Sequence, residues 1–431
     1  MYFEILICTI LLFFYYKGAK SIRNSLASYI MRFFVLLYVA QIILAILDPY
    51  SFYHIGVETV VFFNIQICMM VCGAYNGSRS NRFSKTAVFS WPIVNINKYA
   101  IAFITVLLFY TLWNYNRMQT FILTEASMSQ EARAYYYTTF FASYTLRVID
   151  FILTAYKYVA IIVSFILILA KKRKFRIKEL YYVVATLIIF ALQTLISQGR
   201  LEVMVMVFIA LFFMFFCRIY DYNNFKHKLL PVSIIGLGGV CLLFGLTTLL
   251  RVNMTGEGFD MDLFGELIIE PFATYFYVPI LAFDYGRSNI LDFGYPFLGA
   301  ATLAFIVDTI ILPFAAVFKE LNAFTMDHVL GNSMGVGGYF PNGNHWMAMY
   351  TGCANYYLDF WYFGFFIFPY IHGMVISKLS SLSVKKPFYL ICCTFFFYCT
   401  FRHTTSLGIQ SISTSFFLFW AWMTVKTKTI K

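Results

Sequence analysis

The residues best suited to chemistry in this chain are arginines at the ends of apolar runs. Arg200 stands in the turn Ser197–Glu202, between the apolar runs 180–196 and 203–217. A guanidinium presents a planar, permanently charged fork that matches phosphate oxygens in pairs. The same setting recurs at Arg147, Arg251 and Arg402. This pattern predicts binding of an anionic headgroup; snorkelling and local pairing, as of Arg200 with Glu202, are the structural alternative.

A second polar patch, 331–346, is rich in glycine and in residue types that contact sugars. Its glycines permit tight turns and leave backbone N–H groups available to an anion or a sugar. The sugar-contacting types are Asn342, Asn344, His345 and Trp346. A flexible external loop is the alternative interpretation. The patch is not a P-loop, because Gly-x-x-x-x-Gly-Lys is absent.

Metal-ligand patterns in the sequence are weak. Asp260-Met-Asp262 has the Asp-x-Asp form by which some sugar transferases hold a metal, but two acids at this spacing often occur by chance. Most of the nine cysteines lie in apolar runs, as packing residues do. We therefore expect neither a metal nor another cofactor.

The elements that must position these residues are membrane helices. The 431 residues are 61% hydrophobic and 12% charged, too little charge to cover a soluble surface. This composition predicts an all-α, polytopic transmembrane protein. Two weaker stretches, 266–283 and 298–317, cross as a pair or not at all, which makes 13 or 11 spans. The predicted spans are 1–16, 32–47, 55–74, 99–113, 148–170, 180–196, 203–217, 230–250, 351–377, 388–401 and 407–425.

Basic residues in the loops predict the orientation of these spans. The loops that begin at 17, 75, 171, 218 and 378, with the C-terminal tail, carry most of the lysines. They are expected in the cytoplasm, so the N-terminus lies outside and the C-terminus inside. The opposite side holds eight basic residues, seven of them arginine. External arginines oppose the usual charge bias of membrane proteins, so their presence favours a role in binding an anionic group. The net charge of +12 is explained by the lysines of the cytoplasmic loops and does not indicate nucleic-acid binding.

We expect one integral membrane domain over 1–431, with a smaller external loop at 114–147 and a larger one at 251–350. The larger region holds five of the ten prolines and is predicted to form short or re-entrant helices. Of the charges inside predicted spans, Asp150 and Lys157 share a helix face and can neutralise each other. Glu58 and Asp308 have no partner evident from sequence. So sparse a set does not predict a proton relay.

Three features together resemble the bacterial O-antigen polymerase (Wzy-like) family of oligosaccharide repeat-unit polymerases. The first is the turn Ser197-Gln-Gly-Arg200, and the second is the long external loop late in the chain. The third is Asn344-His-Trp-Met-Ala-Met-Tyr-Thr351 followed by Tyr356-Tyr-Leu-Asp-Phe-Trp-Tyr-Phe-Gly364. The spacing from Asn to Thr is longer than in the family, and Trp361 stands where the family has a first glycine.

The resemblance implies metal-independent glycosyl transfer at the outer side of the bacterial cytoplasmic membrane. A glycan on undecaprenyl pyrophosphate would move onto the next lipid-linked repeat unit, building O-antigen, capsule or exopolysaccharide. Arg200 and Arg251 would stabilise the leaving pyrophosphate, supported by Arg287 and Arg402. Candidates for a general base are Glu202, Glu270, His345 and His403. Predicted substrate-binding residues also include Arg147, Tyr357 and Asp359. Because Asp359 lies just inside a predicted helix, a structural role is the alternative for this residue.

The partners that follow are the lipid-linked oligosaccharide, the bilayer, a chain-length regulator and a flippase. Two other functions fit the same features: a flippase for lipid-linked oligosaccharides and an O-antigen ligase-type transferase. A flippase would be expected to show repeat symmetry and basic residues along a central cavity. A membrane acyltransferase would need a catalytic histidine, for which His372 is a candidate without supporting acids.

Overall fold

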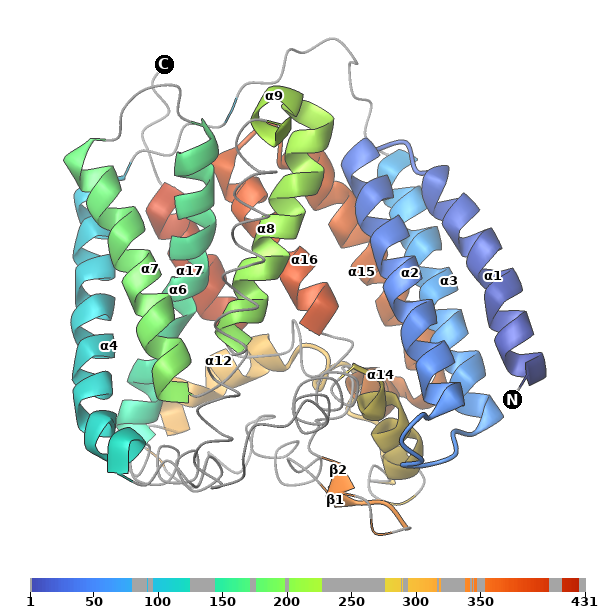
Figure 1. Cartoon of the computed structure of the whole chain (residues 1–431). Helices are drawn as coiled ribbons and strands as arrows, with labels where there is room; N and C mark the ends of the chain where they lie inside the picture. The colour runs from blue at the N-terminus through green and yellow to red at the C-terminus, as the bar shows by residue number, and fades with distance from the viewer. Residues whose placement is uncertain are drawn as a thin grey trace, which may run out of the picture. The chain divides into compact units, whose positions relative to one another are not determined.

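The computed structural model describes most of the chain, and its regular structure is helical apart from one short pair of strands. The described residues are 2–79, 91, 96–124, 144–170, 176–197, 201–226, 276–287, 289, 294–315, 318, 338–341, 343, 345–346, 353–402 and 413–425. The helices before residue 230 are α1 Tyr2–Lys20, α2 Ser25–Leu47, α3 Val57–Arg79, α4 Lys98–Thr124, α6 Tyr144–Ala170, α7 Ile177–Ser197, α8 Leu201–Tyr220 and α9 Tyr222–Asn224 (Figure 1). The later elements are a helix at 276–287, α12 Ala304–Ala315, β1 Gly338–Tyr339, β2 His345–Trp346, α14 Cys353–Phe360, the 3-10 turn η4 Trp361–Phe363, α15 Gly364–Leu382, α16 Pro387–Arg402 and α17 Ser413–Val425.

A helix coincides with every predicted span except 230–250, which lies outside the described residues. Among the described residues, six helical segments are long and apolar enough to cross a membrane. They are Tyr2–Lys20, Ser25–Leu47, Val57–Arg79, Ile152–Ala170, Ile177–Thr194 and Cys353–Leu382. The prediction of an all-helical architecture is thus confirmed for this part of the chain.

The helices extend beyond the apolar runs because local capping, and not hydropathy, sets where they end. α2 begins at Ser25, well before the predicted 32, because the side chain of Asn24 accepts a hydrogen bond from the N–H of Ala27 at 2.8 Å. α4 continues to Thr124, since no glycine or proline interrupts residues 114–124. Together with α6, which begins at Tyr144, this helix covers the two ends of the predicted external loop 114–147. Residues 125–143 between them lie outside the described residues, so the external loop stays a prediction.

The contacts divide the chain into two compact units. The first comprises 1–88, 269–383 and 396–414, and the second comprises 89–268, 384–395 and 415–431. Both units join segments that are far apart in sequence. The expectation of a single integral domain over 1–431 stays a prediction, since two packing units can belong to one domain.

The second unit is held together by aromatic side chains. Trp420 of α17 donates a hydrogen bond from its indole N–H to the carbonyl of Ile152 at 2.8 Å. Its ring packs edge-on against Phe103 of α4 and Tyr156 of α6, with centroids 4.4 and 5.4 Å away. These contacts tie the C-terminal helix to helices from the first half of the chain.

The first unit depends on an unusually close approach of α3 and α15. A Cβ atom added at Gly73 would lie 1.9 Å from the carbonyl oxygen of Tyr370, and one at Gly373 would lie 2.0 Å from that of Met70. The two backbones therefore touch, and only glycine fits at these points. Gly73 faces Tyr370 and Gly77 faces Met374, so the two helices run parallel. As a result, the start of α3 lies beside the turn that begins α15.

The 251–350 region contains a short helix and a hairpin. α12 has 12 residues, about 18 Å at 1.5 Å per residue, so it falls short of a hydrocarbon core of about 30 Å. Figure 1 shows α12 running across the direction of α2 and α3. β1 and β2 pair antiparallel, with Tyr339 opposite His345, around a turn in which the N–H of Gly343 donates to the carbonyl of Phe340 at 2.9 Å. The short helices expected there are present, and the hairpin was not predicted.

Replacing Gly73 with alanine should destabilise the protein by about 1–3 kcal/mol, because the new methyl group would force the two backbones apart. Thermal unfolding in detergent, followed by circular dichroism, measures the effect. Gly18→Ala is the matched control, since its Cβ would meet a single side-chain carbon, Cγ1 of Val71, at 3.3 Å and no backbone atom. Equal melting temperatures for the two variants would contradict the close packing of α3 on α15.

Candidate functional site

The guanidinium of Arg287 joins three segments of the first unit at the start of α3 and α15. Arg287 belongs to the helix whose described residues are 276–287 and 289. Its Nη1 atom lies 2.9 Å from Oε2 of Glu58 and donates to the hydroxyl oxygen of Tyr362 at 2.6 Å. Its Nη2 atom lies 3.6 Å from Oδ1 of Asp284, one helical turn earlier. An arginine, a tyrosine and two carboxylates therefore form one cluster, which we name the Arg287 cluster.

The members of the Arg287 cluster differ sharply in exposure. The side chain of Arg287 is 13% exposed and that of Asp284 is 5% exposed, whereas that of Glu58 is 68% exposed. Burial alone would lower the pKa of Arg287, but the hydrogen bond to Glu58 and the nearby Tyr362 and Asp284 outweigh it and raise the pKa. Asp284 is thus the internal counter-ion of a permanently charged arginine, and Glu58 is the carboxylate that solvent reaches.

Two buried or partly buried aspartates hold the loop before α3 in place. Asp284 accepts hydrogen bonds from the N–H of Gly56 at 2.8 Å and from the hydroxyl of Thr59. Asp48 accepts from the N–H of Tyr53 at 2.9 Å and from the hydroxyl of Tyr277 at 3.1 Å. Because each carboxylate links the 48–59 segment to the 276–287 helix, the position of Glu58 relative to Arg287 is set by the protein.

Aromatic rings pack the hairpin against the same loop. Phe340, which lies between β1 and β2, stacks on Tyr53 with a centroid distance of 5.3 Å and an interplanar angle of 11°. Tyr285 packs edge-on against both rings. Burial, together with the charge of Asp284, raises the pKa of Tyr53, although Arg287 opposes the shift. Tyr53 therefore remains a neutral hydrogen-bonding group near the Arg287 cluster.

The turn η4 presents three consecutive aromatic residues beside the Arg287 cluster. Tyr362 stacks on Phe62 of α3 at 4.4 Å, and Tyr357 packs edge-on against it at 5.5 Å. Trp361 and Phe363 on either side are exposed. Trp361 has a φ of 48°, a left-handed conformation that favours glycine and that costs other residues roughly 1–2 kcal/mol. This is the position at which the polymerase pattern has glycine.

Asp359 has its carboxylate committed to the protein backbone. Oδ1 accepts hydrogen bonds from the N–H groups of Gly299 and Ala301, both at 2.9 Å, and Oδ2 accepts from that of Thr302 at 2.7 Å. The side chain is fully buried. These contacts fold the 297–302 turn onto α14 and give Asp359 a structural role, while its predicted substrate binding stays a prediction.

Of the residues predicted from sequence, the structure brings Arg287 and Tyr357 together through Tyr362. Asp359 lies on α14 two residues beyond Tyr357, and Arg402 ends α16. Only the backbone is described for Arg147 in α6, Glu202 in α8, and His345 and Trp346 in β2. The predicted residues that lie outside the described part of the chain are Arg200, Arg251, Glu270, Asn342, Asn344 and His403.

Glu58, Asp284 and Tyr362 are members of the Arg287 cluster that were not selected from sequence. Glu58, for which the sequence offered no partner, is paired with Arg287. It lies in the first turn of α3, which begins at Val57, and its side chain is exposed. Glu58 could have been selected from sequence, because it is an acidic residue at the predicted external end of a span, on the side where arginines are in excess. Nothing in the sequence indicated which arginine would meet it.

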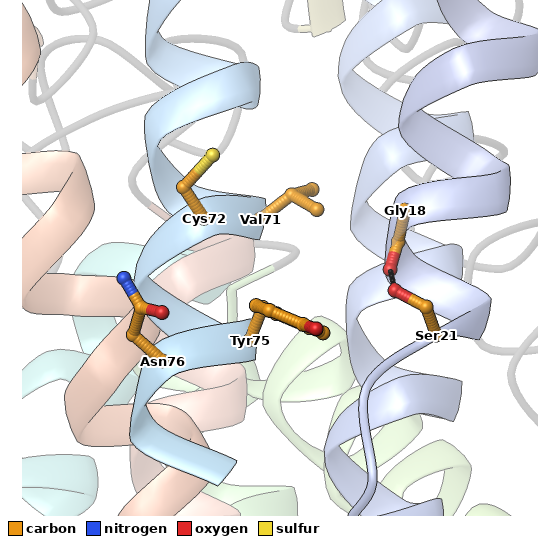
Figure 2. A pocket seen from close by; sticks show the side chains of 6 residues that line it. All are labelled: Gly18, Ser21, Val71, Cys72, Tyr75 and Asn76. Carbon is orange, nitrogen blue, oxygen red and sulfur yellow. Dashed lines mark hydrogen bonds between the residues drawn. The ribbon is translucent and has the colours of Figure 1, made fainter. Parts of the chain in front are cut away.

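Two other features lie away from the Arg287 cluster. A hollow of about 330 Å³ lies between the end of α1 and α3, lined by Gly18, Ser21, Val71, Cys72, Tyr75 and Asn76 (Figure 2). It is at the opposite end of α3 from Glu58, so it does not belong to the same site. His372 hydrogen bonds with the hydroxyl of Thr400 at 2.8 Å. Within the described ranges, no group of three or more His, Cys, Asp or Glu residues could hold a metal ion.

Comparison of the chain with protein families, with characterised proteins and with solved structures gives no match. The function must therefore be argued from the residues and geometry of the chain itself.

Replacing Asp359 with alanine should destabilise the protein by about 3 kcal/mol, because three backbone N–H groups would lose a charged acceptor in a buried site. Asp359→Asn, which keeps the shape and one acceptor oxygen, should cost less. Thermal unfolding in detergent compares the two. An unchanged melting temperature in Asp359→Ala with loss of activity would instead favour the substrate-binding role predicted from sequence.

The strain at Trp361 predicts that Trp361→Gly is more stable than Trp361→Ala by about 1 kcal/mol. Both changes remove the ring, but only glycine adopts the left-handed conformation without cost. Chemical unfolding of the two variants in the same detergent isolates the backbone effect. A Trp361→Ala variant as stable as Trp361→Gly would show that this turn is unstrained.

Proposed function

We propose that this chain is a multi-pass protein of the bacterial cytoplasmic membrane, with its N-terminus outside and its C-terminus in the cytoplasm. The six long apolar helices support a membrane location. The distribution of lysine and arginine in the loops supports the orientation. The short α12 favours the alternative in which neither weak stretch crosses, and hence 11 spans.

Within this topology, we propose that the protein polymerises oligosaccharide repeat units carried on undecaprenyl pyrophosphate. The observation that carries the proposal is the Arg287 cluster, a solvent-facing carboxylate held by a partly buried arginine at the predicted outer ends of α3 and α15. Exposed aromatic rings flank it on η4. A carboxylate, a hydroxyl and aromatic faces at a membrane surface suit a carbohydrate whose lipid carrier stays in the bilayer.

The transfer requires a cation for the leaving group as well as a site for the acceptor. The anomeric carbon of the growing glycan leaves the pyrophosphate oxygen and bonds to a hydroxyl of the next repeat unit, and undecaprenyl pyrophosphate is released. Because the Nη atoms of Arg287 already contact Glu58, Tyr362 and Asp284, its guanidinium is poorly placed to take the pyrophosphate. We assign that role to Arg200 and Arg251, as the sequence predicted, with fixed cations stabilising the charge that develops.

Deletion of the gene tests this function through the length of the surface glycan. Loss of a polymerase should leave single repeat units at the surface while long chains disappear. Loss of even the single units would point to a flippase. Long chains that are made but not attached to their final acceptor would point to a ligase. Electrophoresis of the surface glycan, with mass spectrometry of the lipid-linked units, separates these outcomes.

Complementation with Arg200→Lys should restore little polymer, because lysine keeps the charge but loses the fork that pairs with phosphate oxygens. We expect initial transfer rates to fall roughly 100-fold, as when one charge-stabilising donor is removed from an active site. Arg79→Lys, at the other end of α3 from Glu58, is the matched control and should complement fully. Full chain length with Arg200→Lys would refute the phosphate-binding role.

A further inference from the structure

We propose that Glu58 is the general base of the transfer, taking the proton from the acceptor hydroxyl, and that Arg287 is the residue that positions it. This assignment rests on the polymerase function proposed above. It adds a residue to the reaction, since the bases suggested by the sequence were Glu202, Glu270, His345 and His403.

The contacts of Glu58 are poorly explained by structural stabilisation alone. The positive charge of Arg287 already has a buried counter-ion in Asp284, which is 5% exposed. A second carboxylate that is 68% exposed adds little stability, because exposed ion pairs contribute about 0–1 kcal/mol. The cluster nevertheless fixes the direction of this carboxylate. That arrangement is the one expected of a reactive group that must meet its substrate in a defined orientation.

The geometry leaves one oxygen of Glu58 available. Oε2 accepts from Nη1 of Arg287 at 2.9 Å, and no hydrogen bond within the described residues engages Oε1. The same Nη1 atom donates to the hydroxyl of Tyr362, whose ring is stacked on Phe62. Arg287 thereby connects the carboxylate of Glu58 to the stacked rings of Tyr362 and Phe62. The hydroxyl oxygen of Tyr362 adds a polar group at the same point, where a second hydroxyl of a sugar could bind.

The surroundings suit the acceptor sugar better than they suit the pyrophosphate. Two carboxylates against one guanidinium make the Arg287 cluster formally negative, which disfavours a phosphate group. Neutral sugars bind through hydrogen bonds to carboxylates together with contact of their apolar faces on aromatic rings. The exposed ring of Trp361, next to Tyr362, provides such a face. The left-handed conformation of Trp361 is a local strain of the kind that occurs at ligand-binding sites.

The acceptor oxygen attacks the anomeric carbon of the donor glycan, the bond from that carbon to the pyrophosphate oxygen breaks, and the electron pair leaves with undecaprenyl pyrophosphate. The proton of the acceptor hydroxyl passes to Oε1 of Glu58 and then to water, which restores the carboxylate. Within the described part of the chain, Glu58 contacts Arg287, which in turn contacts Asp284 and the hydroxyl of Tyr362.

The test uses full-length protein in nanodiscs and the lipid-linked repeat units that accumulate in the deletion strain. Glu58→Gln keeps the size and the acceptor oxygen toward Arg287 but cannot take a proton. We expect kcat to fall about 100-fold with KM changed less than threefold, as for loss of a general base. Native mass spectrometry should show that the variant still binds the lipid-linked unit.

Matched variants separate the possible outcomes. Glu58→Asp should retain more activity than Glu58→Gln, and Glu179→Gln, a carboxylate on the predicted cytoplasmic side, should match the wild type. Arg287→Lys should lower kcat with KM changed less than threefold, because lysine loses the contacts that fix the direction of the Glu58 carboxylate but leaves the carboxylate itself in place. A Glu58→Gln variant with wild-type kcat, or with a change in KM alone, would overturn the assignment. A wild-type protein that binds the units but transfers nothing would overturn the polymerase function itself.

Discussion

The close contact of α3 with α15 is the constraint on which the candidate site depends. Gly73 and Gly373 let two backbones approach to a distance at which any side chain would collide with a carbonyl oxygen. Because the two helices run parallel at this contact, their first turns lie at the same end of the first unit. Glu58 and Tyr362 are separated by some 300 residues in sequence, yet both reach Nη1 of Arg287. A shift of one helical turn, about 5.4 Å, would separate them.

The second requirement is that the positive charge of Arg287, at the edge of an apolar structure, be compensated by a nearby negative charge. Asp284 is buried beside Arg287 and also accepts hydrogen bonds from Gly56 and Thr59. One carboxylate therefore neutralises the arginine and anchors the loop that leads into α3. Since this internal pairing already compensates the buried charge, Glu58 can face solvent. The resulting division, with one carboxylate structural and the other available, underlies the assignment of Glu58 to proton transfer.

The strained turn at Trp361 explains why the sequence pattern has glycine at this position. The pattern that this segment resembles has glycine at the position where the chain has tryptophan. The structure shows a physical reason for glycine there, because the backbone enters α15 through a positive φ. Gly364, three residues later, is needed for another reason, since a Cβ atom there would lie 1.9 Å from the carbonyl oxygen of Tyr356. Glycine is therefore favoured at position 361 by the backbone conformation and required at position 364 by packing.

The sequence by itself determined the helices, because an apolar run of membrane length has one low-energy way to satisfy its backbone hydrogen bonds. It also indicated that Arg287 and the segment around Tyr357 belong to a polar site. It missed where α2 begins and where α4 ends, since capping groups and the absence of helix breakers extend a helix past its apolar run. Only the tertiary structure decided that Glu58 meets Arg287 and that Asp359 folds a turn. The pairing of Glu58 with Arg287 depends on the register of α3 against α15. That register is set by the close approach of Gly73 and Gly373 to backbone carbonyl groups of the other helix, which leaves no periodic signal in the sequence.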